Sequence, residues 1–364
     1  MSVSTLLDFS ETIKKLLESI SALKSQLTIV IVANVKGVTA TSDYGKHSVI
    51  TDFFSEEELE QIIVAYRDFG FYTHVFTDEL DFMKSVSNGT FNEIPGKKKI
   101  IYNTAQKGIG AARHSLVPAF CKAYDIPYIG SNAYVSCLCR HKYHFNKLLG
   151  RYHEHVPQSW LFDYNLGWLL DQKPPEGLKV IAKPVYEAAS IGISEASVFE
   201  YSSGKDEFLI FQSKEFCQPL AVEQFIDGYE VEVPIIISGQ TYSLGPVGIS
   251  LNGQKELGGN ILSYDGVYND NYSFYEFSEI KPAITKAILA CTTNSSSILG
   301  IEDFGRIDFR VSSDGEFYLT DITTGPHTTK HSSCNHIFNK HGFSHSDLLT
   351  TLAACAAQRL SWFI

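Results

Sequence analysis

The sequence is short of positive charge and has no long apolar run. Its 30 Lys and Arg residues stand against 41 Asp and Glu residues, which gives a formal net charge of −11. A surface built mainly to hold nucleic acid or anionic lipid needs the opposite excess, although a local basic pocket for a small anion stays open. No apolar run reaches the ~18 residues of a membrane span, and the opening MSVSTLLDFSETIKKLLESI mixes acids with lysines. We therefore expect a soluble, cytoplasmic protein without nucleic-acid or membrane partners.

Internal repeats, low-complexity tracts and a dense cysteine framework are also missing. The 7 cysteines are odd in number and scattered, unlike those of a small disulfide-rich secreted domain. Hydrophobic residues make up 44% and charged residues 20%, which is typical of an ordinary folded protein. Because a domain has roughly 100–200 residues, a chain of 364 residues predicts two or three domains.

Strand-like and helix-like segments alternate in the first third of the chain. Residues 6–27 have apolar positions at helical spacing, while LTIVIVANV (27–35) and KKIIYNT (98–104) are apolar runs typical of strands buried on both faces of a parallel sheet. This alternation predicts a doubly wound α/β domain. A helical connector from Ala133 to about Leu149 should follow it.

The pattern changes near Val156 to short strands with one helix, which indicates a smaller α+β domain. Beyond about Val231 come more strands, a hairpin and a closing helix. We predict an N-terminal α/β domain (1–132), a central domain with the connector helix (133–220) and a C-terminal domain (221–364).

The stretch GRIDFRVSSDGEFYLTDIT predicts a hairpin with acidic residues on one face. If residues 313–316 form a four-residue loop, Asp308 lies opposite Asp321. Facing carboxylates repel unless a cation lies between them, and oxygen ligands beside Arg306 suit Mg²⁺ carrying a phosphate group. Taken alone, a solvent-facing hairpin with acids balanced by Arg306 and Arg310 is the simpler interpretation.

Three upstream segments carry cations or small residues. Lys183 lies in the apolar strand VIAKPV, where it either needs an anionic partner or reaches solvent at the strand end. The loop YEAASIGIS, with Ser190 and Gly192, has backbone N–H groups able to fold over phosphates, although an ordinary surface loop has the same composition. Lys142 on the connector helix by itself indicates a solvated basic face.

The segment AVEQFIDGYEVEV places Glu223 at the end of an apolar strand and Glu230 seven residues later. The intervening Phe225 and Ile226 can hold a flat base, and Glu230 can accept hydrogen bonds from sugar hydroxyls. An inter-domain hinge has a similar sequence.

The order of these motifs resembles the ATP-grasp superfamily, and within it the D-alanine–D-alanine ligase family. The resemblance runs from about Asn103, through IPYIGSNAYVSCLCRHK, IAKP, VEQFIDGYE and GRIDF, to about Ser333. The 13-residue step from Asp308 to Asp321 matches the step between the family's two acidic metal ligands. The resemblance implies a three-domain ATP-grasp fold, with ATP between the central and C-terminal domains.

The resemblance implies a role for each motif residue. The residues expected to bind ATP fall into three groups. Lys142 and Lys183 contact the phosphates, the loop with Glu187, Ser190 and Gly192 covers them, and the adenine and ribose are held by Glu223, Phe225, Ile226 and Glu230. The residues expected at the reaction centre are metal ligands and catalytic or substrate-binding groups: Asp308, Asp321 and Thr323 for Mg²⁺, then Arg306, Lys183, His327 and Ser332.

This sequence departs from the family pattern mainly around the amino-acid site. The second acid is the shorter Asp321, and Thr323 stands at the family's Asn position, so a second Mg²⁺ is in question. His327 replaces a Gly of the oxyanion region, Ala189 replaces a Ser of the phosphate loop, and Val267 stands near an expected Lys. ANVKGVTATSDYGKHSV also lacks the Glu that orients the first D-alanine.

The resemblance implies an ATP-dependent carboxylate–amine ligase that joins amino acids or similar small molecules through an acyl phosphate, with ATP and Mg²⁺ as cofactors and a homodimer as a possible assembly. Two alternatives are an ATP-binding protein of the same fold with weakened catalysis, and an ATP-grasp kinase. The spacing His331-x2-Cys334-x-His336 matches none of the usual structural zinc sites, so we expect surface or substrate-pocket histidines.

Overall fold

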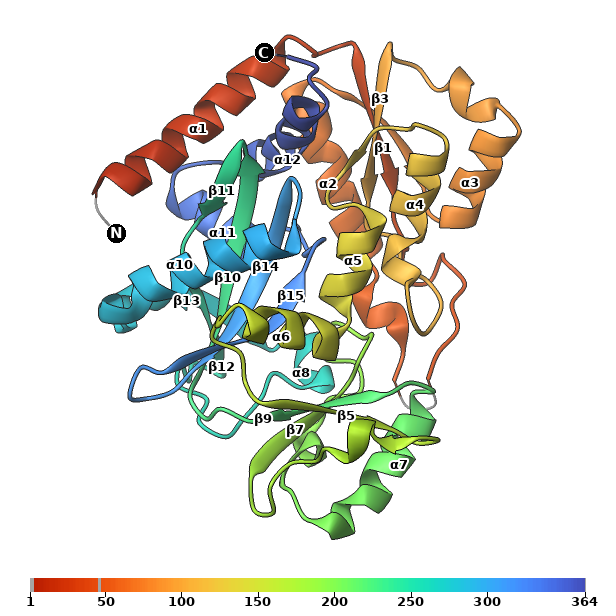
Figure 1. The fold of residues 1–364 in the computed structure, drawn as a ribbon. Helices are drawn as coiled ribbons and strands as arrows, with labels where there is room; N and C mark the ends of the chain where they lie inside the picture. The colour runs from red at the N-terminus through yellow and green to blue at the C-terminus, as the bar shows by residue number, and fades with distance from the viewer. Residues whose placement is uncertain (1–2, 45–46, 364) are drawn as a thin grey trace.

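The computed structural model describes residues 3–44 and 47–363, so two residues of the opening segment and two of the stretch 33–49 lie outside the described residues. Three β-sheets are arranged along the molecule, each covered by helices (Figure 1). No helix in these ranges combines the length and the apolar character needed to cross a bilayer.

The N-terminal sheet is parallel, with strand order β2-β1-β3-β4. Its core strand β1 is buried along its whole length, as expected for a sheet covered on both faces. The predicted doubly wound domain is therefore confirmed. Its strands and helices are β1 (Leu27–Val32), β2 (Tyr72–Phe76), β3 (Lys98–Asn103), β4 (Tyr128–Ile129), α1 (Val3–Ser21), α2 (Glu56–Phe69), α3 (Glu79–Ser87) and α4 (Leu116–Ala123).

Two of the expected helices have different bounds. The first helix ends at Ser21 rather than near Leu27, because Leu27 is already the first residue of β1. The connector is two helices, α5 (Ala133–Arg140) and α6 (Lys142–Arg151). His141 separates them in an extended conformation, and its side chain caps α6 by accepting from the His144 N–H.

The central sheet is antiparallel, with strand order β6-β5-β9-β7-β8 and helix α7 (Asp206–Glu215) against it. Its strands are β5 (Ser159–Asp163), β6 (Gly167–Trp168), β7 (Lys179–Pro184), β8 (Val198–Glu200) and β9 (Leu220–Gln224). The expected domain division between residues 220 and 221 falls within β9, and the pairing of β9 with β5 and β7 makes the whole strand part of the central sheet.

The C-terminal sheet has strand order β13-β12-β10-β14-β15, with β11 paired to β10. The long helix α10 covers it, and α11 and α12 share a core with α1, β1 and β3 of the N-terminal domain. The elements are β10 (Tyr229–Ser238), β11 (Gln240–Ser243), β12 (Val247–Leu251), α8 (Tyr264–Tyr268), β13 (Tyr272–Glu276), α9 (Phe277–Ile280), α10 (Pro282–Leu299), β14 (Phe304–Val311), β15 (Phe317–Thr323), α11 (Ser333–Lys340) and α12 (His345–Arg359). The last helix, α12, thus packs the C-terminal domain against the N-terminal domain.

Gly228 joins the central sheet to β10 and provides a test of this connection. Its φ is 143°, and a Cβ at this position would overlap the backbone carbonyl of Val311. We expect Gly228→Ala to lower the free energy of unfolding by roughly 1–3 kcal/mol, measured by urea denaturation.

Gly239→Ala is the matched control, because Gly239 also has a positive φ, 70°, but has open space around it. It should cost only the backbone strain, about 1 kcal/mol. Equal losses for both variants would contradict the steric explanation.

Candidate active site

A cavity of about 450 Å³ lies where the three domains meet. It brings together nearly all the residues expected from the sequence, namely Lys142, Lys183, Glu187, Ser190, Glu223, Phe225, Ile226, Glu230, Arg306, Asp308, Asp321, Thr323, His327 and Ser332. Gly192 is the exception. It does not line the cavity, and its N–H donates to His47 Nδ1 at 2.7 Å. The roles of the residues remain predictions, but their convergence is a property of the fold.

Asp308 and Asp321 are direct neighbours across the β14–β15 hairpin. The expected four-residue loop is wrong: Val311 pairs with Phe317, which leaves five residues in the loop and shifts the strands by one residue. An uncorrected shift of one would put the two acids on opposite faces. A β-bulge at Thr320 corrects it and restores the pairing.

Arg306 lies between two carboxylates at the end of the cavity that contains Asp308 and Asp321. The sequence predicts the reaction centre there, and we call it the reaction end. Its Nε and Nη2 each donate to an oxygen of Asp308 at 2.7 Å, and its Nη1 is 3.0 Å from Glu232 Oε1. Burial, aided by Glu232 and Asp321 and opposed by Arg306, raises the pKa of Asp308 to about 7. This end of the cavity therefore has more carboxylate than the guanidinium alone can balance.

The lysines expected at the phosphates are buried and paired with acids. Lys183 Nζ is 2.7 Å from Glu223 Oε2 and donates to the Thr320 carbonyl at 3.3 Å, so it does not reach solvent at the strand end. Burial opposes its charge, but Glu223 and Asp321 outweigh burial and raise its pKa. Lys142 Nζ is 3.9 Å from Asp321 Oδ2 and donates to the Glu187 carbonyl. Burial alone would raise the pKa of Asp321, but Lys142 and Lys183 hold it below its usual value.

Next to Lys183 the cavity has groups that fit a nucleoside. The buried Glu223 Oε1 has no hydrogen-bond partner in the described part of the chain, so it can accept from an exocyclic amine. The Phe225 N–H donates to the Lys179 carbonyl, and the Ile226 carbonyl accepts from Arg310 Nε. Among the described residues, the Phe225 carbonyl and the Ile226 N–H have no such partner, so these two groups can form hydrogen bonds with a base. Glu230 lies 3.5 Å from Arg310, and burial raises its pKa.

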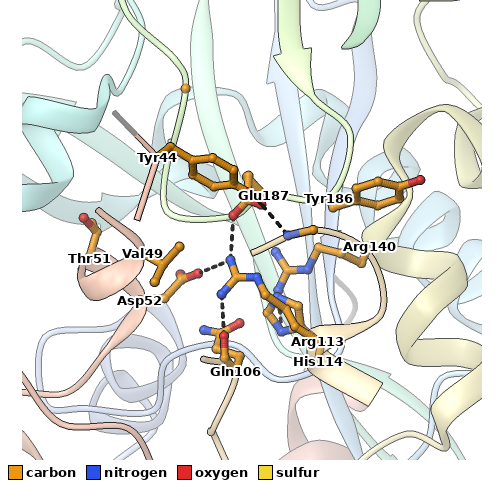
Figure 2. A network of polar contacts seen from close by, with 12 residues as sticks. Tyr44, Val49, Thr51, Asp52, Gln106, Arg113, His114, Arg140, Tyr186 and Glu187 are labelled. Carbon is orange, nitrogen blue, oxygen red and sulfur yellow. Dashed lines mark hydrogen bonds and ion pairs between the residues drawn. The ribbon is translucent and has the colours of Figure 1, made fainter. Parts of the chain in front are cut away.

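The loop expected to cover the phosphates is tied to the N-terminal domain (Figure 2). The Glu187 carboxylate is buried, with Arg113 Nη2 at 2.6 Å, the Tyr44 hydroxyl at 2.5 Å and Gln218 Nε2 at 3.1 Å. Arg113 also contacts Asp52 at 3.2 Å. Sequence reasoning missed Tyr44, Asp52 and Arg113, because nothing in their local sequence indicates that they meet Glu187.

His327 and the start of α11 line the side of the cavity where the sequence predicts the amino-acid substrates. The His327 ring packs edge-on against Phe54. The Ser332 hydroxyl donates to the Thr329 carbonyl and accepts from the Asn335 N–H, so it is occupied as a helix cap. Its neighbour Ser333, which the sequence did not single out, also lines the cavity and has a buried hydroxyl without a partner among the described residues.

The residues of the motif His331-x2-Cys334-x-His336 each have different neighbours. His331 Nδ1 lies 2.7 Å from Asp270, and His336 Nε2 lies 3.0 Å from Glu276. Cys334 is buried in the core shared with the N-terminal sheet. His331 lines the cavity, and His336 packs near Phe274.

The reaction end of the cavity fits a magnesium ion that arrives with a nucleotide. The described residues contain no group of three His, Cys, Asp or Glu side chains placed to hold a metal. Mg²⁺ does not need one, because it is usually held by one or two carboxylates together with phosphate oxygens and waters. Asp308 and Asp321 can provide two carboxylates, and Thr323 follows on the same face of β15. The excess of carboxylate around Arg306 is what such a cation would balance.

Arg113 provides a test of the tie between the loop and the N-terminal domain. Arg113→Met leaves Asp52 and Glu187 buried without a cation, so we expect a loss of about 3–5 kcal/mol in the free energy of unfolding, measured by urea denaturation. Lys84→Met breaks an exposed pair with Asp81 and should change it by less than about 1 kcal/mol. If Arg113→Met lowered the free energy of unfolding as little as the control does, the ion pairs of Arg113 with Asp52 and Glu187 would contribute little to stability.

Comparison with known proteins finds D-alanine–D-alanine ligases among the relatives of this chain. The D-alanine–D-alanine ligase of Cupriavidus metallidurans is 26% identical over 239 residues, covering 64% of this chain and 68% of the relative. That of Bordetella petrii is 27% identical over 181 residues, covering 50% of this chain and 53% of the relative. The chain thus spans only about half to two thirds of these relatives.

Solved structures share the whole fold at low identity. The D-alanine–D-alanine ligase of Bacillus anthracis complexed with ATP superposes with a TM-score of 0.65 at 16% identity, covering 91% of this chain and 98% of that one. The VanG D-Ala:D-Ser ligase of Enterococcus faecalis gives a TM-score of 0.63 at 15% identity.

A family model shows the relationship directly. The model described as "D-ala D-ala ligase C-terminus" matches residues 168–354, which is just over half of the chain. This range includes both facing acids, Arg306 and the paired Lys183 and Glu223. The chain therefore belongs to the D-alanine–D-alanine ligase family of ATP-grasp ligases.

Proposed function

We propose that the protein is an ADP-forming carboxylate–amine ligase that joins two amino acids, or similar small molecules, through an acyl phosphate. The observation that carries this proposal is the convergence of Lys142, Lys183, Arg306 and the facing pair Asp308 and Asp321 in one cavity. A carboxylate is a poor acylating agent because its oxide is a poor leaving group, and phosphorylation replaces it with a good one.

Activation begins when a carboxylate oxygen of the donor attacks the γ-phosphorus of ATP and ADP departs. Lys142 and Lys183, both held by acids of the cavity, lie where they can neutralise charge on the transferred phosphoryl group. Asp308 and Asp321 would hold Mg²⁺, which supplies further charge neutralisation when bound. The tied loop 187–192 would keep water away from the activated carboxyl.

Amide formation follows when the amine of the second substrate attacks the acyl carbon. The carbon–nitrogen bond forms, the carbon–oxygen bond to phosphate breaks, and the amine loses a proton. Arg306, fixed by Asp308 and Glu232, lies where it can compensate the oxyanion and the departing phosphate. His327 and the start of α11 would contact the amino-acid substrates.

The alternative is a nucleotide-binding protein whose ligation is weakened. Thr323, Val267 and His327 favour it, because each stands where the family pattern has a different residue. Incubating the protein with MgATP and a panel of D- and L-amino acids separates the possibilities. ADP formed only with an amino acid, together with a new amide, supports the ligase. A stable phosphorylated product without an amide would indicate a kinase, and no ADP with any amino acid would favour the binding protein.

Asp308 and Lys183 provide the direct test of the reaction centre. We expect Asp308→Asn and Lys183→Met each to lower kcat for amino-acid-dependent ADP release by about 10²–10³-fold, because the first weakens the hold on Mg²⁺ and the second removes a cation next to the transferred phosphoryl group. The control is Lys84→Met, which breaks an exposed pair with Asp81 within α3, apart from the residues that line the cavity, and should retain activity. Full turnover in the Asp308 variant would defeat the metal assignment.

His327 tests the substrate side separately. His327→Gly opens the cavity beside Phe54 without touching Lys183 or Asp308, so we expect the ratio of kcat/KM between amino acids in the panel to change by about 10-fold or more, while the KM for ATP stays within a factor of two. An unchanged ratio would remove His327 from the substrate site.

A further inference from the structure

Arg140 is a cation of the cavity that has no carboxylate partner among the residues the structure describes. It is the last residue of α5 and lines the cavity two residues before Lys142. Its Nη2 shares a hydrogen bond with His114 Nδ1 at 3.0 Å, and in the described part of the chain it forms no ion pair. Two of the acids whose charge acts on it, Asp52 and Glu187, both contact Arg113 instead (Figure 2).

The surroundings of Arg140 hold it in place without neutralising it. Burial, together with Arg140 and Arg113, keeps the pKa of His114 well below its usual value, so the ring is neutral and accepts from the guanidinium. Burial and the nearby Arg113 also lower the pKa of Arg140. A guanidinium has five donors, and the bond to His114 uses one of them. Arg140 is partly exposed where it lines the cavity, so its unused donors can reach an anion bound there.

The position of Arg140 indicates which anion would bind there. Its charge acts on Asp321, the acid proposed at the phosphates, and on Asp52, which belongs to the N-terminal domain. Arg140 therefore lies between the phosphate end of the cavity and the domain that closes the substrate side. An oxyanion here would stand next to the γ-phosphate, as the attacking carboxylate must.

We propose that Arg140, positioned by His114, binds the carboxylate of the amino acid that is activated. This rests on the proposed ligase function and adds a substrate-binding residue that neither the motifs nor the family match indicates. The carboxylate would give the guanidinium the ion pair that no acid of the described chain provides, so this part of the site favours anionic donors.

The test uses binding rather than turnover. Protein saturated with MgADP is titrated calorimetrically with each enantiomer of 1-aminoethylphosphonate, an unreactive anion that resembles an amino acid. We expect Arg140→Met to weaken the better enantiomer at least ten-fold and Arg140→Lys to weaken it less. The affinities for MgADP and for Mg²⁺ with the non-hydrolysable analogue AMP-PNP should change less than two-fold.

Thermal unfolding separates ligand binding from a structural role. Because Arg140→Met removes an unpaired charge, its Tm should stay level or rise, and Arg151→Met, at an exposed position of α6, serves as the matched control. A large fall in Tm for Arg140→Met, restored by Arg140→Lys, would indicate a structural residue and overturn the proposal.

Three further outcomes would also overturn it. These are an unchanged phosphonate affinity in Arg140→Met, the absence of phosphonate binding by the unaltered protein, and a loss confined to AMP-PNP, which would make Arg140 a ligand of the γ-phosphate. None of these measurements needs catalysis. A failure of the ligase proposal, seen as no amino-acid-dependent ADP release, is therefore distinguishable from a failure of the Arg140 proposal.

Discussion

Two carboxylates, Asp308 and Asp321, face each other across a hairpin inside a cavity where burial makes negative charge costly. Each needs a cation, and the fold provides one from a different direction: Arg306 from the same strand and Lys142 from the connector helices. Lys183, in turn, is held by Glu223 and by the carbonyl of the bulge residue Thr320. The positions of Arg306, Lys142 and Lys183 in the cavity therefore depend on this pair.

A second set of buried charges joins the N-terminal domain to the cavity. Arg113 lies between Asp52 and Glu187, and the Glu187 carbonyl accepts from Lys142. Movement of the N-terminal domain would thus disturb both the loop 187–192 and Lys142. This coupling suits a reaction whose activated carboxyl has to be protected from water.

The sequence predicted the strands, the order of the motifs and the parity of the hairpin, because alternating side chains and apolar runs are local signals. The loop length was wrong, and the bulge at Thr320 that compensates for it has no clear sequence signal. Gly192 was placed in the cavity although its N–H binds His47. Ser332 was expected among the catalytic or substrate-binding groups although its hydroxyl caps α11, whereas Ser333 beside it, whose hydroxyl has no partner among the described residues, was missed.

The sequence by itself determined which residue types are present and how far apart they lie along the chain: two acids 13 residues apart, a lysine within an apolar strand, and a family pattern altered mainly at the amino-acid positions. Only the tertiary structure decided which charges neutralise one another. Asp52, Arg113 and Glu187 come from distant segments, and their pairing leaves Arg140 without an acid. The physical reason is that charge balance in a buried site depends on distances through space, which local sequence patterns do not encode.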